Sequence, residues 1–169
     1  YGIDLTLERF LGDNYYYLIT GSIFTSKYKA GDNVWRNTRY NKVFVLNALF
    51  GKEFYFANNR KVLDVNARVT VTGGERYSPI LQSQSLAAKR VIFDESRAFS
   101  EQLRPLTYAD LTVNYRINHH KSSSVFSFQM KNVLGAPIYI DHNYNYQTGQ
   151  IELSKATLVI PNISYKIEF

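Results

Sequence analysis

The last nine residues of the chain alternate between two kinds of side chain, which limits what they can fold into. Successive side chains of a β-strand point to opposite faces, so a period of two places one kind on each face. One face would carry Ile163, Tyr165, Ile167 and Phe169, and the other would carry Asn162, Ser164, Lys166 and Glu168. The pattern predicts a strand with an apolar, aromatic face and a polar face, and this strand continues to the final residue.

The same period recurs along the rest of the chain. Residues 63–72 alternate ten times without an exception, close to the ~9–11 residues that a tilted membrane strand needs. Further strands are predicted over residues 2–10, 15–27, 39–56, 105–117, 124–133 and 161–169, which gives seven in all. A half-buried strand of a soluble β-sandwich shows the same alternation, so this pattern alone leaves both environments open.

Two of the predicted strands are less regular than the others. In residues 39–56, Asn47 decides the facing, because it would point to a wet interior if the strand spans a membrane. The outward set would then be Phe44, Leu46, Ala48 and Phe50, and the inward set Val43, Val45 and Leu49. In residues 15–27 the facing stays open, because Tyr17, Ile19 and Ile23 share one parity and Leu18 and Phe24 have the other.

The connections between these strands differ in length in a regular order. Short turns at residues 11–14, 57–61 and 119–122 alternate with long loops at residues 28–38, 75–104 and 135–150. A short helix is expected within residues 86–103. Outer-membrane β-barrels have short turns at one end and longer extracellular loops at the other. The alternation of lengths therefore favours a membrane barrel over a soluble meander.

Composition is consistent with this interpretation. Aromatic residues make up 15% of the 169 residues, with 14 Tyr and 11 Phe, and they suit both strands and membrane interfaces. The absence of cysteine excludes a disulfide scaffold and a thiolate metal site. The net charge of +6 comes from scattered basic residues, which argues against a nucleic-acid partner.

Seven is an odd number of strands, whereas single-chain bacterial barrels have an even number. The first strand would begin at the long-loop end and the last would finish at the short-turn end. Residues 1–169 are therefore expected to be the C-terminal segment of a larger transmembrane barrel, with its other strands and any plug outside this sequence. A processed or excised piece would also explain a start at Tyr1 without a methionine.

Several segments resemble a known family, the TonB-dependent outer-membrane receptors, at their C-terminal end. The resemblance is to the SusC-like branch, which carries a carboxypeptidase-regulatory-like N-terminal domain. The matching segments are residues 37–41, 47–54, 73–79, 94–102, 108–116, 131–133 and 161–169. They follow one another in order over most of the chain.

The resemblance implies a barrel of about 22 strands with a plugged lumen in the Gram-negative cell outer membrane. The implied function is active import of a nutrient such as a metal chelate, a glycan or a peptide, with no enzyme activity and no cofactor. The implied partners are outer-membrane lipid, the plug and remaining strands, the TonB complex through an N-terminal part, and a surface lipoprotein. The terminal residues Ile163, Tyr165, Ile167 and Phe169 would be the signal that the barrel-assembly machinery recognises.

Candidate ligand contacts lie in the long loops. They are Tyr28, Trp35, Arg76, Tyr77, Asp94, Arg97, Asp141 and His142. Each of them could equally be a solvent-exposed loop residue without a ligand. The charged residues between 94 and 101 could instead form salt bridges that pack the loop. Asp64, Arg68, Asp110 and Arg116 would line the lumen and pair with each other or with a plug.

No spacing in the chain indicates a catalytic or metal site. The adjacent residues His119 and His120 would point to opposite faces of a strand, so a solvated turn is the simpler interpretation. No Ser/His/Asp set or pair of carboxylates has a spacing that suggests catalysis.

Two alternatives compete with the transporter. One is a complete small outer-membrane barrel of about eight strands, acting as an adhesin or a structural protein. The other is a soluble β-barrel or sandwich that binds lipid. The soluble alternative predicts that Val65, Val69, Leu111 and Ile167 are sealed inside a compact body.

Overall fold

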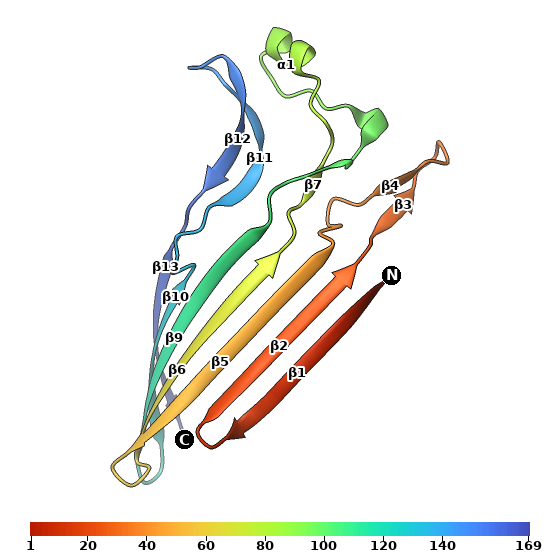
Figure 1. Ribbon diagram of the computed structural model, residues 1–169. Helices are drawn as coiled ribbons and strands as arrows, with labels where there is room; N and C mark the ends of the chain where they lie inside the picture. Colours follow the sequence, from red (N-terminus) through yellow and green to blue (C-terminus); the bar gives the residue numbers. More distant parts are fainter.

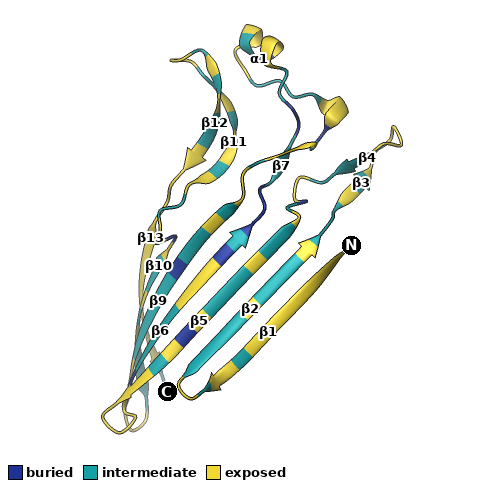
Figure 2. Ribbon diagram, in the orientation of Figure 1, coloured by how far each residue is buried: buried dark blue, intermediate teal, exposed yellow.

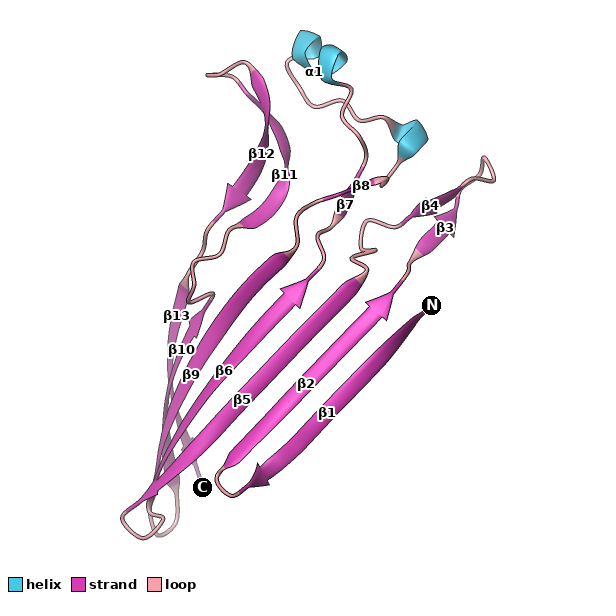
Figure 3. Ribbon diagram, in the orientation of Figure 1, coloured by secondary structure: helices cyan, strands magenta, loops and turns pink.

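Seven antiparallel strands form one curved sheet in the computed structural model, which describes all 169 residues (Figure 3). Their spatial order follows the chain, as in a meander. They are β1 (Gly2–Gly12), β2 (Tyr15–Phe24), β5 (Phe44–Phe56), β6 (Lys61–Thr72), β9 (Leu106–Asn118), β10 (Ser123–Lys131) and β13 (Ile160–Glu168). The predicted all-β antiparallel meander is confirmed.

The remaining elements lie at one end of the sheet (Figure 1). They form three two-stranded sheets, one helix and one 3-10 turn. These are β3 (Lys27–Lys29) with β4 (Trp35–Asn37), β7 (Arg76–Tyr77) with β8 (Glu101–Gln102), β11 (Ile138–Asn145) with β12 (Gln150–Ala156), α1 (Gln82–Ala88) and Glu95–Arg97. The three short turns lie at the opposite end, so the predicted sorting of connections by length is confirmed. The helix α1 is too short and too polar to cross a membrane.

Two of the short turns follow directly from their residues. Asp13 and Asn14 both have positive φ, of 52° and 68°, and so do Asn58 and Asn59, at 54° and 66°. Asn and Asp tolerate this left-handed region better than other side chains, and turns of this kind match the twist of the strands they join. The Asp and Asn residues at these positions therefore suit the backbone conformation of both turns.

Strand register places most of the apolar residues of the seven strands on one face of the sheet. One row across the sheet runs through Leu7, Ile19, Ala48, Val69 and Ala109, and the next through Tyr17, Phe50, Ala67, Leu111 and Met130. The opposite face carries rows such as Thr6, Thr20, Asn47, Thr70 and Tyr108, or Asp64, Asn114, Ser127 and Ser164. This register settles the facing that the sequence left open in β2, with Tyr17, Ile19 and Ile23 on the apolar face.

Neither face of the sheet packs against another layer of this chain (Figure 2). The only buried hydrophobic side chains are Val62 and Ala98. Ile163, in the last strand, leaves 80% of its surface exposed. The strands β1 and β13 each pair on one side only, so the sheet is open rather than closed on itself. A sheet normally buries its apolar face, so this surface needs a partner outside the chain.

The structure corrects the start of the third strand. It begins at Phe44 rather than at residue 39, and Val43 precedes it with φ of 72°. Val43 is therefore not an inward-facing strand residue, whereas Val45 and Leu49 do lie on the polar face, opposite Thr72 and Arg68. A side chain on Gly73 would place its Cβ 1.7 Å from the Lys42 carbonyl oxygen, so this close backbone approach requires glycine.

Two loop predictions also need correction. The helix α1 covers Gln82–Ala88 and therefore starts before the expected window of residues 86–103. The loop predicted at residues 135–150 contains most of the hairpin β11–β12, which extends to Ala156. The many Asn and Tyr residues of this hairpin concealed its alternation. The register places His142 with Leu153 and Tyr144 with Ile151 on one face, and Asn143 with Glu152 on the other.

Candidate functional site in the long loops

The polar face of the sheet carries a connected set of hydrogen bonds. The Asp64 carboxylate accepts from the Tyr16 hydroxyl at 2.9 Å, from Asn66 at 3.0 Å and from Asn114 at 2.8 Å. Tyr16 lies across Gly51, where a Cβ would come within 2.1 Å of its ring. These side chains satisfy one another, so this face is a polar surface prepared for contact with water or with polar protein groups.

Two of the four charged residues that were predicted to line the lumen form an ion pair on this face. Arg68 pairs with Asp110, and its Nε donates to Asp110 Oδ2 at 3.1 Å. Asp64 and Arg116 also lie on this face, where they line one hollow of about 690 Å³ near the short turns. The four predicted charged residues thus share the polar face, although only Arg68 and Asp110 form a pair.

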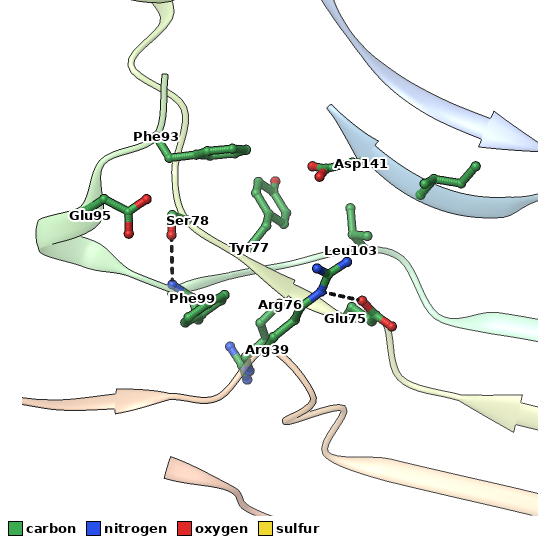
Figure 4. A pocket seen from close by; sticks show the side chains of 11 residues that line it. Arg39, Glu75, Arg76, Tyr77, Ser78, Phe93, Glu95, Phe99, Leu103 and Asp141 are labelled. Atoms are coloured by element: carbon green, nitrogen blue, oxygen red, sulfur yellow. Dashed lines mark hydrogen bonds and ion pairs between the residues drawn. The ribbon is translucent and has the colours of Figure 1, made fainter. Parts of the chain in front are cut away.

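A cavity of about 170 Å³ lies among the long loops (Figure 4). Its charged lining groups are Arg39, Glu75, Arg76, Glu95 and Asp141, and the others are Tyr77, Ser78, Phe93, Phe99, Leu103 and Ile140. Strands β7 and β11 and the segments that flank β4 and β8 contribute these residues. Three separate loops therefore build one small site with both charged and aromatic walls.

Ion pairs and hydrogen bonds hold this cavity together. Arg39 Nε donates to Glu75 Oε2 at 2.9 Å, and Arg76 Nε donates to the Asn41 carbonyl oxygen at 3.0 Å. The Glu75 carboxylate, with a further contribution from Asp141, raises the pKa of Arg39 above its ordinary value. Arg39 therefore stays charged and keeps its other guanidinium donors available to a ligand.

Aromatic side chains form the second part of the site. Tyr77 and His142 lie with their ring centroids 4.7 Å apart, which joins β7 to β11. Burial, with a smaller effect of Glu101, raises the pKa of the Tyr77 hydroxyl. Burial also lowers the pKa of His142, although Asp141 acts in the opposite direction. Both rings are therefore neutral near pH 7 and present flat, apolar surfaces.

The structure divides the eight predicted contact residues into two groups. Arg76, Tyr77 and Asp141 line the cavity, and His142 contacts Tyr77. Trp35 and Arg97 line a different hollow, between β3–β4 and the segment around the 3-10 turn. The other two lie beside them, since Asp94 Oδ2 accepts from Arg97 Nε at 2.8 Å and Tyr28 pairs with Arg36 across β3–β4. The charged segment 94–101 is thus partly engaged in loop packing.

Several lining residues were not among the predicted contacts. They are Arg39, Glu75, Ser78, Phe93, Glu95, Phe99, Leu103 and Ile140. Arg39 and Glu75 were detectable in principle, because each lies in a segment that carries the family resemblance. No sequence pattern marks Leu103 and Ile140 as cavity residues, because they line the cavity only where two loops distant in sequence meet.

The C-terminal residues lie on a free edge of the sheet. Ile163, Tyr165 and Ile167 share the apolar face of β13, and Phe169 follows its last residue. The Tyr165 ring packs on Phe126 of β10 with centroids 4.7 Å apart, and its hydroxyl lies 3.3 Å from Ser124 Oγ. The terminal strand therefore offers an aromatic surface together with unpaired backbone groups.

Protonation of His142 should loosen the hairpin β11–β12 from β7. Its folded-state pKa is below the ordinary 6.5, so the unfolded form binds more protons in the window below pH 6.5. Docking of the hairpin is therefore favoured at higher pH and weakens as the pH falls through 6.5. Hydrogen exchange of residues 138–156 should speed up between pH 7.5 and 5 after correction for intrinsic rates. The variant His142→Phe should remove this pH response, and its persistence would contradict the assignment.

No group of three or more His, Asp or Glu side chains is placed to hold a metal ion, and His119 and His120 lie in the exposed turn after β9. No protein-family model, curated protein or solved structure matches the chain.

Proposed function

We propose that this chain forms part of the wall and the outer loops of a TonB-dependent active transporter of the Gram-negative outer membrane. The exposed apolar face of the sheet would contact lipid, and the polar face would line the lumen. The long hairpins would lie outside the cell, where the loop cavity takes part in binding the nutrient. The chain would have no enzyme activity.

The distribution of side chains over the seven strands carries this proposal. Each strand is about the length of a bilayer crossing. The apolar face carries mostly aliphatic and aromatic rows, and its charged members Arg9 and Lys52 lie toward the short turns. Val69 and Ile167 are exposed, and Val65 and Leu111 are only half-buried. A soluble lipid-binding barrel would instead seal these residues in a core, so the structure favours the membrane alternative.

The complete small barrel is the closer competitor. The sheet here is open, with β1 and β13 at its edges, so seven strands alone do not form a closed wall. The size of the natural protein in outer-membrane extracts separates the two proposals. A polypeptide several times larger than 19.6 kDa supports the transporter, and one near that mass supports the small barrel.

Spin labelling tests which face meets lipid. The chain has no cysteine, so Val113→Cys and Thr112→Cys each create a single labelling site, on opposite faces of β9. In the membrane-embedded protein, the label at 113 should collide with oxygen, which concentrates in lipid, and be shielded from a water-soluble nickel complex. The label at 112 should show the reverse preference. Water access at 113, or shielding from both reagents, would overturn the proposal.

A further inference from the structure

A second hollow, of about 210 Å³, lies between the hairpin β3–β4 and the segment around the 3-10 turn. Its lining contains three basic residues and no acidic one. The lining residues are Lys27, Val34, Trp35, Arg36, Asn37, Ser96, Arg97, Ala98 and Ser100. Since a water molecule occupies roughly 30 Å³ of liquid, the hollow has room for a ring of about six atoms with a substituent.

The three cations are placed in different ways. Lys27 takes part in no ion pair or hydrogen bond of its side chain, and it is exposed. Arg36 is held by Asp32 at 2.8 and 2.6 Å and reaches the Ser96 carbonyl oxygen at 3.3 Å. Its side chain is only 12% exposed, and its Nε has no partner. One free cation and one fixed, incompletely satisfied guanidinium therefore line the same hollow.

Arg97 completes this set. Its Nε donates to Asp94 Oδ2 at 2.8 Å, which fixes the guanidinium and leaves its two amino groups without a protein acceptor. The Arg36 guanidinium lowers the pKa of Asp32 to about 2, so the carboxylate that positions Arg36 stays ionised at any physiological pH. The hydroxyl of Ser100 has no hydrogen-bond partner and adds a further donor.

Trp35 supplies an apolar wall to this hollow. It is 64% exposed, and it is the one tryptophan of the chain. An indole ring that is held on a β-hairpin and left open to solvent can stack on the apolar face of a sugar ring or on an aromatic ring. The hollow thus combines donors for an anion with a flat surface beside them.

We propose that this hollow is a subsite for an anionic group, a carboxylate or a sulfate, carried on a sugar ring that stacks on Trp35. The proposal rests on the transporter function and narrows its nutrient to an acidic saccharide. Guanidinium groups bind carboxylates and sulfates through paired N–H donors, and the free ammonium of Lys27 adds an unshared charge. The carboxylates of Asp32 and Asp94 hold the two arginines and do not line the hollow.

Fluorescence of Trp35 in the detergent-solubilised protein tests this subsite. Titration with glucuronate should give a saturable change, with glucose, which has the same ring without the charge, binding at least tenfold more weakly. Inorganic sulfate, which has the charge without the ring, should also bind at least tenfold more weakly than glucuronate. Equal affinity for glucuronate and glucose, equal affinity for glucuronate and sulfate, or no saturable change would overturn the proposal.

The variant Lys27→Met tests the role of the free cation without disturbing loop packing, because the Lys27 side chain makes no hydrogen bond. We expect glucuronate affinity to fall about tenfold, while Lys61→Met, at the opposite end of the sheet, leaves it unchanged. Unchanged affinity in Lys27→Met would contradict the assignment. Spin labels on β9 report only which face of the sheet meets lipid, and the glucuronate titration reports only binding in the hollow. A failure of the subsite proposal and a failure of the transporter proposal therefore give different results.

Discussion

Replacement of Leu111 by arginine is expected to lower the free energy of unfolding of the membrane-embedded protein by about 2–4 kcal/mol. Leu111 lies near the middle of β9, on the apolar face, between Ala67 on one side and Met130 on the other. A charged side chain near the centre of the hydrocarbon layer loses its hydration, and no acidic residue lies beside it in the neighbouring strands. Equilibrium unfolding by urea in phospholipid vesicles measures this loss.

The matched control is Thr112→Arg, one residue further along the same strand. Thr112 faces the polar side, between Asn66 and Gln129, so the new charge would lie in the wet lumen. We expect its unfolding free energy to change by less than about 1 kcal/mol. Equal losses in the two variants would show that both faces meet the same environment, and they would contradict a lipid-facing apolar surface.

The two faces of the sheet were predictable because each depends on a local pattern. In β6 the alternation of residues 63–72 fixes which side chains share a face, whatever the strand pairs with. Asn47 then identifies the polar face of β5, and the register confirms this by placing it between Thr20 and Thr70. The turns at Asp13–Asn14 and Asn58–Asn59 are equally local, because side chains that tolerate positive φ mark them.

The assembly of the loop site was not predictable in the same way. Arg39 and Glu75 form an ion pair although 36 residues separate them in the sequence. Tyr77 contacts His142, although β8, β9 and β10 lie between them in the sequence. Such contacts depend on how independent loops meet, for which the sequence has no periodic signal. The hairpin β11–β12 was missed for a related reason, since it pairs outside the main sheet and the Asn and Tyr residues of β11 obscure its alternation.

Contacts made by Asp110 show how far a single charged residue can act across the sheet. Asp110 is only 5% exposed and lies on the polar face at the loop end of β9. It pairs with Arg68 of β6, and its Oδ1 accepts the backbone N–H of Asn132 at 3.0 Å. Asn132 in turn donates to the carbonyl oxygens of Ala136 and Leu158, at 2.9 and 3.1 Å. Asp110 thus joins β6, β9, the end of β10 and the approach to β13.

Substitution of Asp110 by alanine is therefore expected to lower the free energy of unfolding by about 2–3 kcal/mol. The substitution removes the charged acceptor of two donors, the Arg68 guanidinium and the buried backbone N–H of Asn132. The penalty stays below that of a fully buried ion pair, since the Arg68 side chain is 48% exposed and regains water. Asp4→Ala, on the same face of edge strand β1, should change the unfolding free energy by less than about 0.5 kcal/mol.

Comparison of two single variants separates the two contacts of Asp110. Arg68→Met removes the ion pair and leaves the acceptor of the Asn132 N–H in place, so it should cost less than Asp110→Ala. Hydrogen exchange at the Asn132 amide should accelerate in Asp110→Ala and stay slow in Arg68→Met. Equal unfolding free energies in the two variants, with a protected Asn132 amide in both, would show that the ion pair alone matters. In that case the long hairpin β11–β12 would depend on contacts other than Asp110 for its position at the end of the sheet.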